Sequence, residues 1–224
     1  MKLSVLIPAY NEHETIEKLI RRVAAVDLGT GSEIEIIVVD DGSNDGTREI
    51  LATLDVPGLR VIEHERNRGK GGAIRTALAA ATGDAVIFQD ADLEYDPQDY
   101  VQLWQPIAQG DAQVVYGVRD LGDQSFLRRF GNHFLTWATN VLYGTHLKDM
   151  ETCYKMIAMP IARKLDLQAQ RFDMEPEITA KLIRAGHTIH EAPISYAPRL
   201  VRKLSPWRDG WPALWTLVKY RFFH

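Results

Sequence analysis

Two acidic side chains near the middle of the chain have the type and spacing of a metal site. Asp90 and Asp92 follow residues 85–89, an apolar run with the character of a buried strand. Carboxylates at positions i and i+2 of extended backbone point to the same side, and Mg²⁺ and Mn²⁺ prefer carboxylate oxygens. A cation held by only two carboxylates keeps open positions, which suit a nucleotide diphosphate. A lone pair of this kind is more often part of a solvated turn, so the rest of the chain decides.

Two other segments that follow apolar runs are also polar. Residues 8–12 read Pro-Ala-Tyr-Asn-Glu, and residues 40–43 read Asp-Asp-Gly-Ser. In parallel α/β sheets, ligands bind at the carboxyl ends of the strands, where acidic side chains can bind a base and ribose hydroxyls. The alternative is that Asn11 and Ser43 cap helices and that Asp41 belongs to a turn. The agreement of three strand ends favours a nucleotide site.

Two common nucleotide motifs are missing. A dinucleotide fold needs Gly-x-Gly-x-x-Gly after the first strand, where this chain has Pro8 and Tyr10, and a P-loop needs Ser or Thr after its lysine, where Lys70 is followed by Gly71. We interpret residues 69–72 as a flexible basic loop near phosphate or base, with a plain helix-entry turn as the alternative.

Strand and helix patterns alternate along the first half, which predicts a parallel sheet covered by helices on both faces. In the first half we expect strands at 3–7, 33–39, 59–64, 85–89 and 114–118, and helices at 12–26, from Ser43 or Asn44 to 54, at 73–81 and at 97–109. In the second half we expect helices at 121–146, 175–185 and 209–223 and strands at 151–159 and 188–196. The chain shows no repeat or linker, so residues 1–224 form one domain.

Composition narrows the class of protein. The chain has 224 residues, 46% of them hydrophobic, a formal net charge of −4 and a single cysteine, Cys153. The negative charge argues against a nucleic-acid partner, and one cysteine excludes an internal disulfide framework. No apolar run reaches 18 residues, so we expect no membrane span and a cytoplasmic protein, peripheral on a membrane at most.

Four segments together resemble the family 2 glycosyltransferases, and among these the dolichol-phosphate mannose synthases and related polyprenyl-phosphate glycosyltransferases. They are Ile-Pro-Ala-Tyr-Asn-Glu at 7–12, Val-Val-Asp-Asp-Gly-Ser-Asn-Asp-Gly-Thr at 38–47, Asn-Arg-Gly-Lys-Gly-Gly-Ala at 67–73 and Asp-Ala-Asp-Leu-Glu at 90–94. The resemblance implies an α/β GT-A fold, which is Rossmann-like, with a nucleotide-sugar-binding half at 1–120 and an acceptor-binding half at 121–224. It also implies inverting transfer of a hexose from a GDP-mannose or UDP-glucose type of donor, with Mg²⁺ or Mn²⁺ as cofactor.

The resemblance assigns residue roles position by position. Metal would be held by Asp90 and Asp92, and the acceptor would be bound by Arg128, Asn132 and Glu94. Asp92, Arg119 and Arg128 would take part in catalysis. The nucleotide sugar would contact Pro8, Tyr10, Glu12, Asp41, Lys70, Asp90, Ala91, Asp92, Arg199 and Lys203. Residues 199–204 resemble a basic loop that closes over the diphosphate, but they lack its usual glycines, so which cation closes stays open.

Two kinds of acceptor remain possible at this point. A phosphate monoester carries about −1.5 to −2 charges at pH 7, so it needs cationic positioning by arginines and no general base. A hydroxyl of a glycan or glycolipid needs a base, for which Asp149 or Glu151 can serve. A non-catalytic nucleotide-sugar-binding or membrane-associated protein is a further alternative, against which the intact Asp-x-Asp speaks.

The last segment suggests a membrane contact. Trp211, Trp215, Val218 and Phe222 share a helical face, and Trp207 and Leu214 lie close by with the cations Arg208, Lys219 and Arg221. Tryptophan and cations on one helix are typical of a lipid interface, while a core-packed closing helix is the equal alternative. A membrane surface or a separate membrane subunit would then be a partner.

Overall fold

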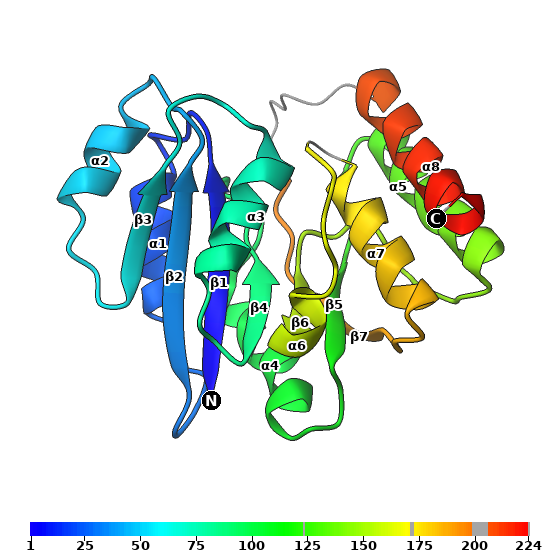
Figure 1. Cartoon of the computed structure of the whole chain (residues 1–224), viewed down its shortest axis with the longest axis horizontal. Helices are drawn as coiled ribbons and strands as arrows, with labels where there is room; N and C mark the ends of the chain where they lie inside the picture. The colour runs from blue at the N-terminus through cyan, green and yellow to red at the C-terminus, as the bar shows by residue number, and fades with distance from the viewer. Residues whose placement is uncertain (123, 171–172, 199–205, 224) are drawn as a thin grey trace.

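The computed structural model describes residues 1–122, 124–170, 173–198 and 206–223, with the side chains of the last stretch described from Gly210 onward. Its centre is one seven-stranded sheet in the order β3-β2-β1-β4-β6-β5-β7 (Figure 1). The strands are β1 (Lys2–Ala9), β2 (Glu33–Asp40), β3 (Leu59–Glu63), β4 (Ala85–Phe88), β5 (Val114–Arg119), β6 (Lys155–Ala158) and β7 (His190–Ile194). The expected mostly parallel sheet is confirmed, with β6 antiparallel to both of its neighbours.

The helices form layers against this sheet. They are α1 (Ile16–Ala24), α2 (Thr47–Thr53), α3 (Lys70–Ala80), α4 (Tyr100–Ala108) after a 3-10 turn at Pro97–Asp99, α5 (Phe126–Tyr143), α6 (Met159–Ala162), α7 (Met174–Arg184) and α8 (Pro206–Phe222). Right-handed crossovers put α1 and α3 on opposite faces, because the chain runs outward from β1 to β3 and then returns to β4 (Figure 1).

The strand register brings the polar segments of the sequence to one edge of the sheet. Ile7 of β1 pairs with Val38 of β2, and Leu6 pairs with Phe88 of β4. The carboxyl ends of these three strands therefore lie side by side. Because β6 runs the other way, its first residue, Lys155, lies opposite Tyr116 of β5, so the segment before β6 reaches the same edge.

Two hydrophobic clusters hold the layers together. The main core contains the buried sheet residues and the inner face of α1, where Ile16, Leu19, Ile20 and Val23 are buried as the spacing predicts. A smaller cluster joins α5 to α8 through Leu135, Leu147, Met150, Ala213 and Leu217. Since β6 and β7 complete the sheet begun by the first 120 residues, the two halves share one framework.

Some local predictions are wrong. Gly46 precedes α2 in a left-handed conformation, with φ of 101°, so neither Ser43 nor Asn44 is its cap. Instead the Ser43 hydroxyl accepts a hydrogen bond from the backbone NH of Asn11 at 3.0 Å. The expected basic loop at 69–72 is also wrong, because Lys70 begins α3. The strand expected at 151–159 is only β6, and α6 was not foreseen.

No helix in the described parts of the chain is both long and apolar enough to cross a bilayer.

Candidate active site

Asp90, Ala91 and Asp92 form a tight segment directly after β4. The side chain of Asp90 is 27% exposed, while Ala91 is buried and its carbonyl oxygen accepts a hydrogen bond from the Thr15 hydroxyl at 2.7 Å. An oxygen of Asp92 accepts from the backbone NH of Glu94 at 3.1 Å. The segment is thus anchored to the loop before α1, and Asp90 stays accessible from solvent.

Left-handed backbone conformations occur at two of the three polar strand ends. Leu93, which follows Asp92, has φ of 60°, and Asn11, in the loop after β1, has φ of 55°. Asparagine tolerates this left-handed region, but a branched residue such as leucine rarely adopts it. Strained positions of this kind cluster at functional sites, and nothing in the sequence pattern pointed to Leu93.

Lys70 lies beside Asp90. Its ammonium nitrogen is 2.7 Å from Oδ1 of Asp90 and 2.7 Å from Oε1 of Glu175. Burial disfavours the ammonium, but the two carboxylates outweigh burial and raise the pKa of Lys70 well above its usual value. Lys70 is therefore a fixed cation at the proposed metal position. Glu175, which contributes the second carboxylate from the first turn of α7, was not foreseen.

Asp40, the last residue of β2, and Asp41, which follows it, bind neighbouring loops. Asp41 accepts from the backbone NH groups of Arg68 and Gly69 at 2.9 and 2.8 Å and from the His64 ring at 2.7 Å. Asp40 accepts two hydrogen bonds from the guanidinium of Arg48, at 2.7 and 3.0 Å. Asp41 thus fixes the chain just before Lys70, and any contact with a base would use its remaining acceptor capacity.

The loop after β1 offers an aromatic surface beside these carboxylates. Tyr10 is 42% exposed, and Pro8 and Glu12 are half-buried. The backbone NH of Glu12 donates to the Thr47 hydroxyl at 2.9 Å, which ties this loop to the start of α2. The arrangement leaves the ring of Tyr10 available for stacking on a base.

Arg119, at the end of β5, is paired with Asp149. Its Nε and one terminal nitrogen donate to the two carboxylate oxygens at 2.7 and 2.8 Å, and both side chains are buried. Its other terminal nitrogen donates to the Tyr95 hydroxyl at 3.2 Å, and its guanidinium lies 5.2 Å from the ring centre of Tyr196. Arg119 and Asp149, proposed from sequence for different roles, therefore form one bidentate ion pair.

Glu94 follows the Asp-x-Asp segment in sequence and is turned into the protein interior. It is 2% exposed, and its Oε2 accepts from the Tyr196 hydroxyl at 2.8 Å. Its carbonyl oxygen accepts from the backbone NH of Ala197 at 2.8 Å. These bonds connect the segment that carries Asp90 and Asp92 to the chain that leaves β7.

Two ionisable side chains lie at the sheet edge between β4 and β5: Glu151 in the segment before β6, and Lys155 at the start of β6. Lys155 is fully buried, donates to the carbonyl oxygens of Met150, at 2.8 Å, and Thr152, and lies 4.6 Å from the ring centre of Tyr116. Burial lowers the pKa of Lys155 to about 8. Burial also raises the pKa of Glu151 to about 7.

Glu151 has a second unusual property. Its Oε1 is buried and has no hydrogen-bond partner among the described residues. A carboxyl group that is half ionised near neutral pH and still has an open acceptor position is suited to proton transfer. The sequence offered Glu151 only as one of two alternatives, and the structure separates it from Asp149, whose oxygens bind Arg119.

The proposed acceptor residues lie at the start of α5. Arg128 is half-buried one turn before Asn132, so both occupy one face of the helix. Asn132 donates to Oε1 of Gln124 at 3.0 Å, and the Nε2 of Gln124 is buried without a partner among the described residues. Arg199 and Lys203 lie outside the described residues.

The donor set fits a divalent cation only together with a further ligand. Among the described residues no group of three or more His, Cys, Asp or Glu side chains is arranged to hold a metal. Two carboxylates supply hard oxygen ligands of the kind that Mg²⁺ and Mn²⁺ prefer, and Mg²⁺ in particular is often bound by one or two carboxylates plus substrate phosphates. Asp90 and Asp92 therefore fit a metal that arrives with a diphosphate.

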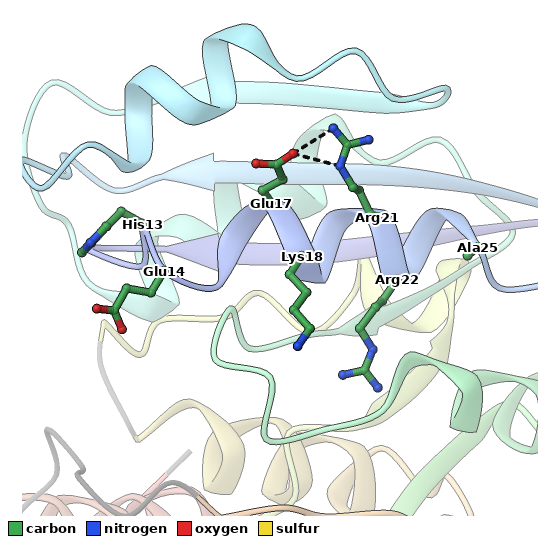
Figure 2. A pocket seen from close by; sticks show the side chains of 7 residues that line it. All are labelled: His13, Glu14, Glu17, Lys18, Arg21, Arg22 and Ala25. Atoms are coloured by element: carbon green, nitrogen blue, oxygen red, sulfur yellow. Dashed lines mark hydrogen bonds and ion pairs between the residues drawn. The ribbon is translucent and has the colours of Figure 1, made fainter.

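A shallow hollow runs along α1, from the loop before the helix to the residue after it (Figure 2). It is lined by His13, Glu14, Glu17, Lys18, Arg21, Arg22 and Ala25. Glu17 and Arg21 form an exposed pair at 2.8 Å along the helix. Exposed ion pairs of this kind contribute little to stability.

Comparison of the sequence with models of known protein families shows to which family the chain belongs. The model described as "Glycosyl transferase family 2" matches residues 4–163. The chain belongs to glycosyl transferase family 2. The resemblance seen in the four sequence motifs is thereby confirmed, and all four motifs lie inside the matched region.

Curated relatives in family 2 include enzymes named for polyprenyl phosphates. The chain is 37% identical over 131 residues to an undecaprenyl-phosphate 4-deoxy-4-formamido-L-arabinose transferase of Sodalis glossinidius, covering 57% of this chain and 40% of that protein. It is 27% identical over 193 residues to a dodecaprenyl-phosphate galacturonate synthase of Rhizobium johnstonii, covering 82% and 55%. The chain thus spans about half the length of the curated relatives it matches.

Solved structures confirm the GT-A fold. A glucosyl-3-phosphoglycerate synthase of Mycobacterium tuberculosis, in complex with phosphoglyceric acid, superimposes with a TM-score of 0.79 at 24% identity, covering 98% of this chain and 79% of that one. The same enzyme with Mn²⁺, UDP and glucosyl-3-phosphoglycerate gives a TM-score of 0.75 at 24% identity, covering 98% and 79%.

Proposed function

We propose that this protein is a metal-dependent inverting glycosyltransferase that moves a sugar from a nucleoside-diphosphate donor, of the GDP-mannose or UDP-glucose type, to a polyprenyl or dolichyl phosphate. The observation that carries the proposal is the Asp90-Ala91-Asp92 segment at the carboxyl edge of the sheet, beside Lys70 and the exposed ring of Tyr10. The names of the curated relatives support the lipid-phosphate acceptor.

Each part of the donor has a proposed binding surface. Tyr10, Pro8, Glu12 and Asp41 surround the base, and Lys70 with Ala91 lies at the diphosphate. Asp90 and Asp92 would hold Mg²⁺ or Mn²⁺. A bound divalent cation supplies positive charge against the developing charge of the leaving diphosphate. Arg199 and Lys203, which lie outside the described residues, are proposed to add to that charge.

The acceptor needs positioning rather than deprotonation. A phosphate oxygen attacks the anomeric carbon while the bond from that carbon to the donor diphosphate breaks, and the nucleoside diphosphate leaves with the electron pair. In-line attack inverts the anomeric carbon. Arg128, with Asn132 on the same face of α5, is proposed to bind the acceptor phosphate. Glu94 is buried against Tyr196, so its proposed part is to hold the Asp-x-Asp segment, and Arg119 contributes through its fixed position at the end of β5.

The test is a transfer assay with a panel of GDP-mannose, UDP-glucose and UDP-GlcNAc, a short polyprenyl phosphate and Mn²⁺. Asp92→Asn should abolish transfer, while Asp111→Asn, which removes an exposed carboxylate before β5 at the opposite sheet edge, should not. Normal turnover by Asp92→Asn, or undiminished activity of wild type in a chelator, would show that the metal site is misassigned.

Glu151 supports a second candidate, transfer to a hydroxyl of a glycan or glycolipid. Its raised pKa of about 7 and its unpartnered Oε1 suit a general base. Under this alternative Glu151→Gln loses activity on hydroxyl acceptors and flattens the pH–rate profile near neutrality. Under the lipid-phosphate proposal the same variant keeps substantial activity on polyprenyl phosphate.

The surface formed by α5 and α8 supports a membrane location for the reaction. On α5, large apolar side chains recur every three or four residues and face solvent, at Phe126, Phe130, Phe134, Trp137 and Val141. On α8, Trp211 and Trp215 are 71% and 60% exposed. The two helices lie side by side (Figure 1) and are joined by the Tyr143 hydroxyl, which donates to the Leu217 carbonyl at 2.7 Å.

We propose that this surface, called the α5–α8 face, binds an anionic lipid membrane. The helix α8 packs inward through Ala213 and Leu217, whereas Trp211 and Trp215 are exposed and lie outside the core. Arg129 and Arg221 are exposed among the aromatic side chains, and each cation near an anionic membrane contributes roughly 1 kcal/mol. Arg128, proposed to bind the acceptor phosphate, lies in the first turn of the same helix α5, which supports a reaction close to the lipid surface.

Liposome binding tests the α5–α8 face. Wild type should bind vesicles of phosphatidylglycerol and phosphatidylcholine at low salt and lose binding at high salt. Trp137→Ala with Trp215→Ala should weaken binding without lowering the melting temperature, because both side chains are exposed. If folded wild type does not bind vesicles, the proposed membrane contact is wrong. If the protein instead self-associates through the same face, that face is an interface between two copies of the chain.

A further inference from the structure

We propose that Glu175 is a positioning residue for the metal site, acting through Lys70, so that Asp90 can bind a divalent cation while a buried lysine stays beside it. This inference rests on the metal site of the proposed function. No sequence motif points to Glu175, which lies 105 positions from Lys70.

The geometry is that of a cation shared by two carboxylates. The Lys70 nitrogen is 2.7 Å from an oxygen of each acid. The side chains of Lys70 and Glu175 are 14% and 9% exposed, whereas Asp90 is 27% exposed. Asp90 is therefore the carboxylate that faces incoming ligands, and Glu175 is the one that stays with the lysine.

Two helix starts are locked together to create this contact. Lys70 is the first residue of α3, and Glu175 lies in the first turn of α7. The backbone NH of Gly71 donates to the Gln170 carbonyl at 3.1 Å. A Cβ on Gly71 would collide with the Ala169 carbonyl oxygen, so the close approach of the two segments depends on glycine at this position.

Charge explains why the second carboxylate matters. When a divalent cation binds Asp90, it draws that carboxylate away from Lys70 and repels the ammonium. If Glu175 were neutral, the Lys70 ammonium would then be left without a counter-charge. An unpaired charge is unfavourable here because the lysine side chain is largely buried. With Glu175 present, Lys70 keeps a partner, and its remaining charge is available to a diphosphate.

The experiment measures Mn²⁺ binding in the presence of UDP or GDP, as the loss of the free-ion paramagnetic resonance signal beyond the loss that the nucleotide alone causes, because the two carboxylates fit a metal that arrives with a diphosphate. Wild type should bind Mn²⁺, and Asp92→Asn should not. Glu175→Gln should weaken Mn²⁺ binding about 10- to 100-fold, the usual effect of removing an outer-shell partner. The half-activating Mn²⁺ concentration of the transfer reaction should rise by the same factor.

A double-mutant cycle separates this role from general destabilisation. In a Lys70→Met background, Glu175→Gln should change Mn²⁺ affinity by less than about threefold, because the ammonium that needs a partner is gone. The matched control is Glu35→Gln, which removes a hydrogen-bonded carboxylate at the opposite edge of the sheet and should leave Mn²⁺ affinity unchanged. Melting temperatures of all variants are measured alongside.

Each outcome decides between the two proposals. If wild type binds no Mn²⁺ at a site sensitive to Asp92→Asn, the metal site itself is wrong and the role of Glu175 falls with it. If wild type binds Mn²⁺ but Glu175→Gln binds equally well, or loses affinity equally in the Lys70→Met background, only the inference about Glu175 is overturned. If Glu175→Gln fails to fold, Glu175→Asp replaces it, since it keeps the charge, shortens the reach to Lys70 and should weaken Mn²⁺ binding to an intermediate degree. Unchanged affinity in folded Glu175→Asp then counts against the inference.

Discussion

Asp149→Asn should destabilise the protein strongly, whatever it does to catalysis. The two carboxylate oxygens of Asp149 bind Arg119 at 2.7 and 2.8 Å, and the side chains are 2% and 4% exposed. Removing one partner of such a pair leaves a buried charge unpaired, at a cost of about 3–5 kcal/mol. For a chain of this length each kcal/mol lowers the melting temperature by about 2–4 °C, so we expect a fall of roughly 6–20 °C.

Thermal and urea unfolding monitored by circular dichroism provide the assay. The double variant Arg119→Met with Asp149→Leu should recover most of the loss, because an apolar pair of similar volume replaces both charges. The control is Glu17→Gln, which breaks an exposed pair with Arg21 and should cost less than about 1 kcal/mol. This account of the pair would be refuted if Asp149→Asn lowered the melting temperature by less than about 2 °C. It would also be refuted if the effects of Arg119→Met and Asp149→Leu simply added in the double variant.

The same result bears on how catalytic variants are interpreted. From the sequence alone, Asp149→Asn is a test for a general base. In the structure Asp149 holds the guanidinium of Arg119 in place, so lost activity in this variant can follow from a displaced arginine. Glu151, whose Oε1 is buried without a partner among the described residues, is the cleaner position at which to test for a base.

Two further perturbations follow from the buried edge of the sheet. Burial raises the pKa of Glu151 from 4.5 to about 7, so the folded protein holds this proton more tightly than the unfolded chain, and its stabilising contribution is present below about pH 4.5 and lost as pH rises to 7. Glu151→Gln should therefore gain stability relative to wild type between about pH 5 and pH 7.5, measured by melting temperature, and a pH-independent difference would contradict the shift. Gly71→Ala should lower both the melting temperature and Mn²⁺ affinity, because its Cβ collides with the Ala169 carbonyl, whereas Gly131→Ala, with open space around its Cβ, should do neither.

Much of the first half of the fold is predictable because its signals are local. Buried parallel strands appear as apolar runs, and the runs at β1, β2 and β4 each end in a polar segment. Sheet topology then brings those segments together without further information. The end of β4 and the Asp-x-Asp segment could therefore be located from sequence, and the family match covers this region.

The partners of these residues could not be predicted in the same way. Lys70 meets Glu175, and Arg119 meets Asp149, across 105 and 30 positions of sequence. Periodicity reports which face of an element is apolar, but not which buried charge lies opposite another after folding. The interpretation of residues 69–72 as a flexible loop failed for a related reason, since Gly71 at the start of α3 is explained by the close approach of residues 169 and 170.

Helix α5 illustrates the limit most clearly, and it also connects the fold to the proposed function. Its pattern predicts a helix but not the environment of its apolar face, which by default would be assigned to the core. In the structure the inner face carries Asn132, Thr136 and Asn140, which hydrogen-bond to Gln124, to the backbone NH of Met150 and to the Leu147 carbonyl and NH. These bonds hold the segment that leads to Asp149 and Glu151 at the sheet edge. The large aromatic residues of α5 lie on the other side, where Phe134 packs against Phe130 and Trp137 but all three side chains stay exposed to solvent. A lipid surface would satisfy that outer face, and the same helix would then hold both the acceptor phosphate and the bilayer from which the acceptor comes.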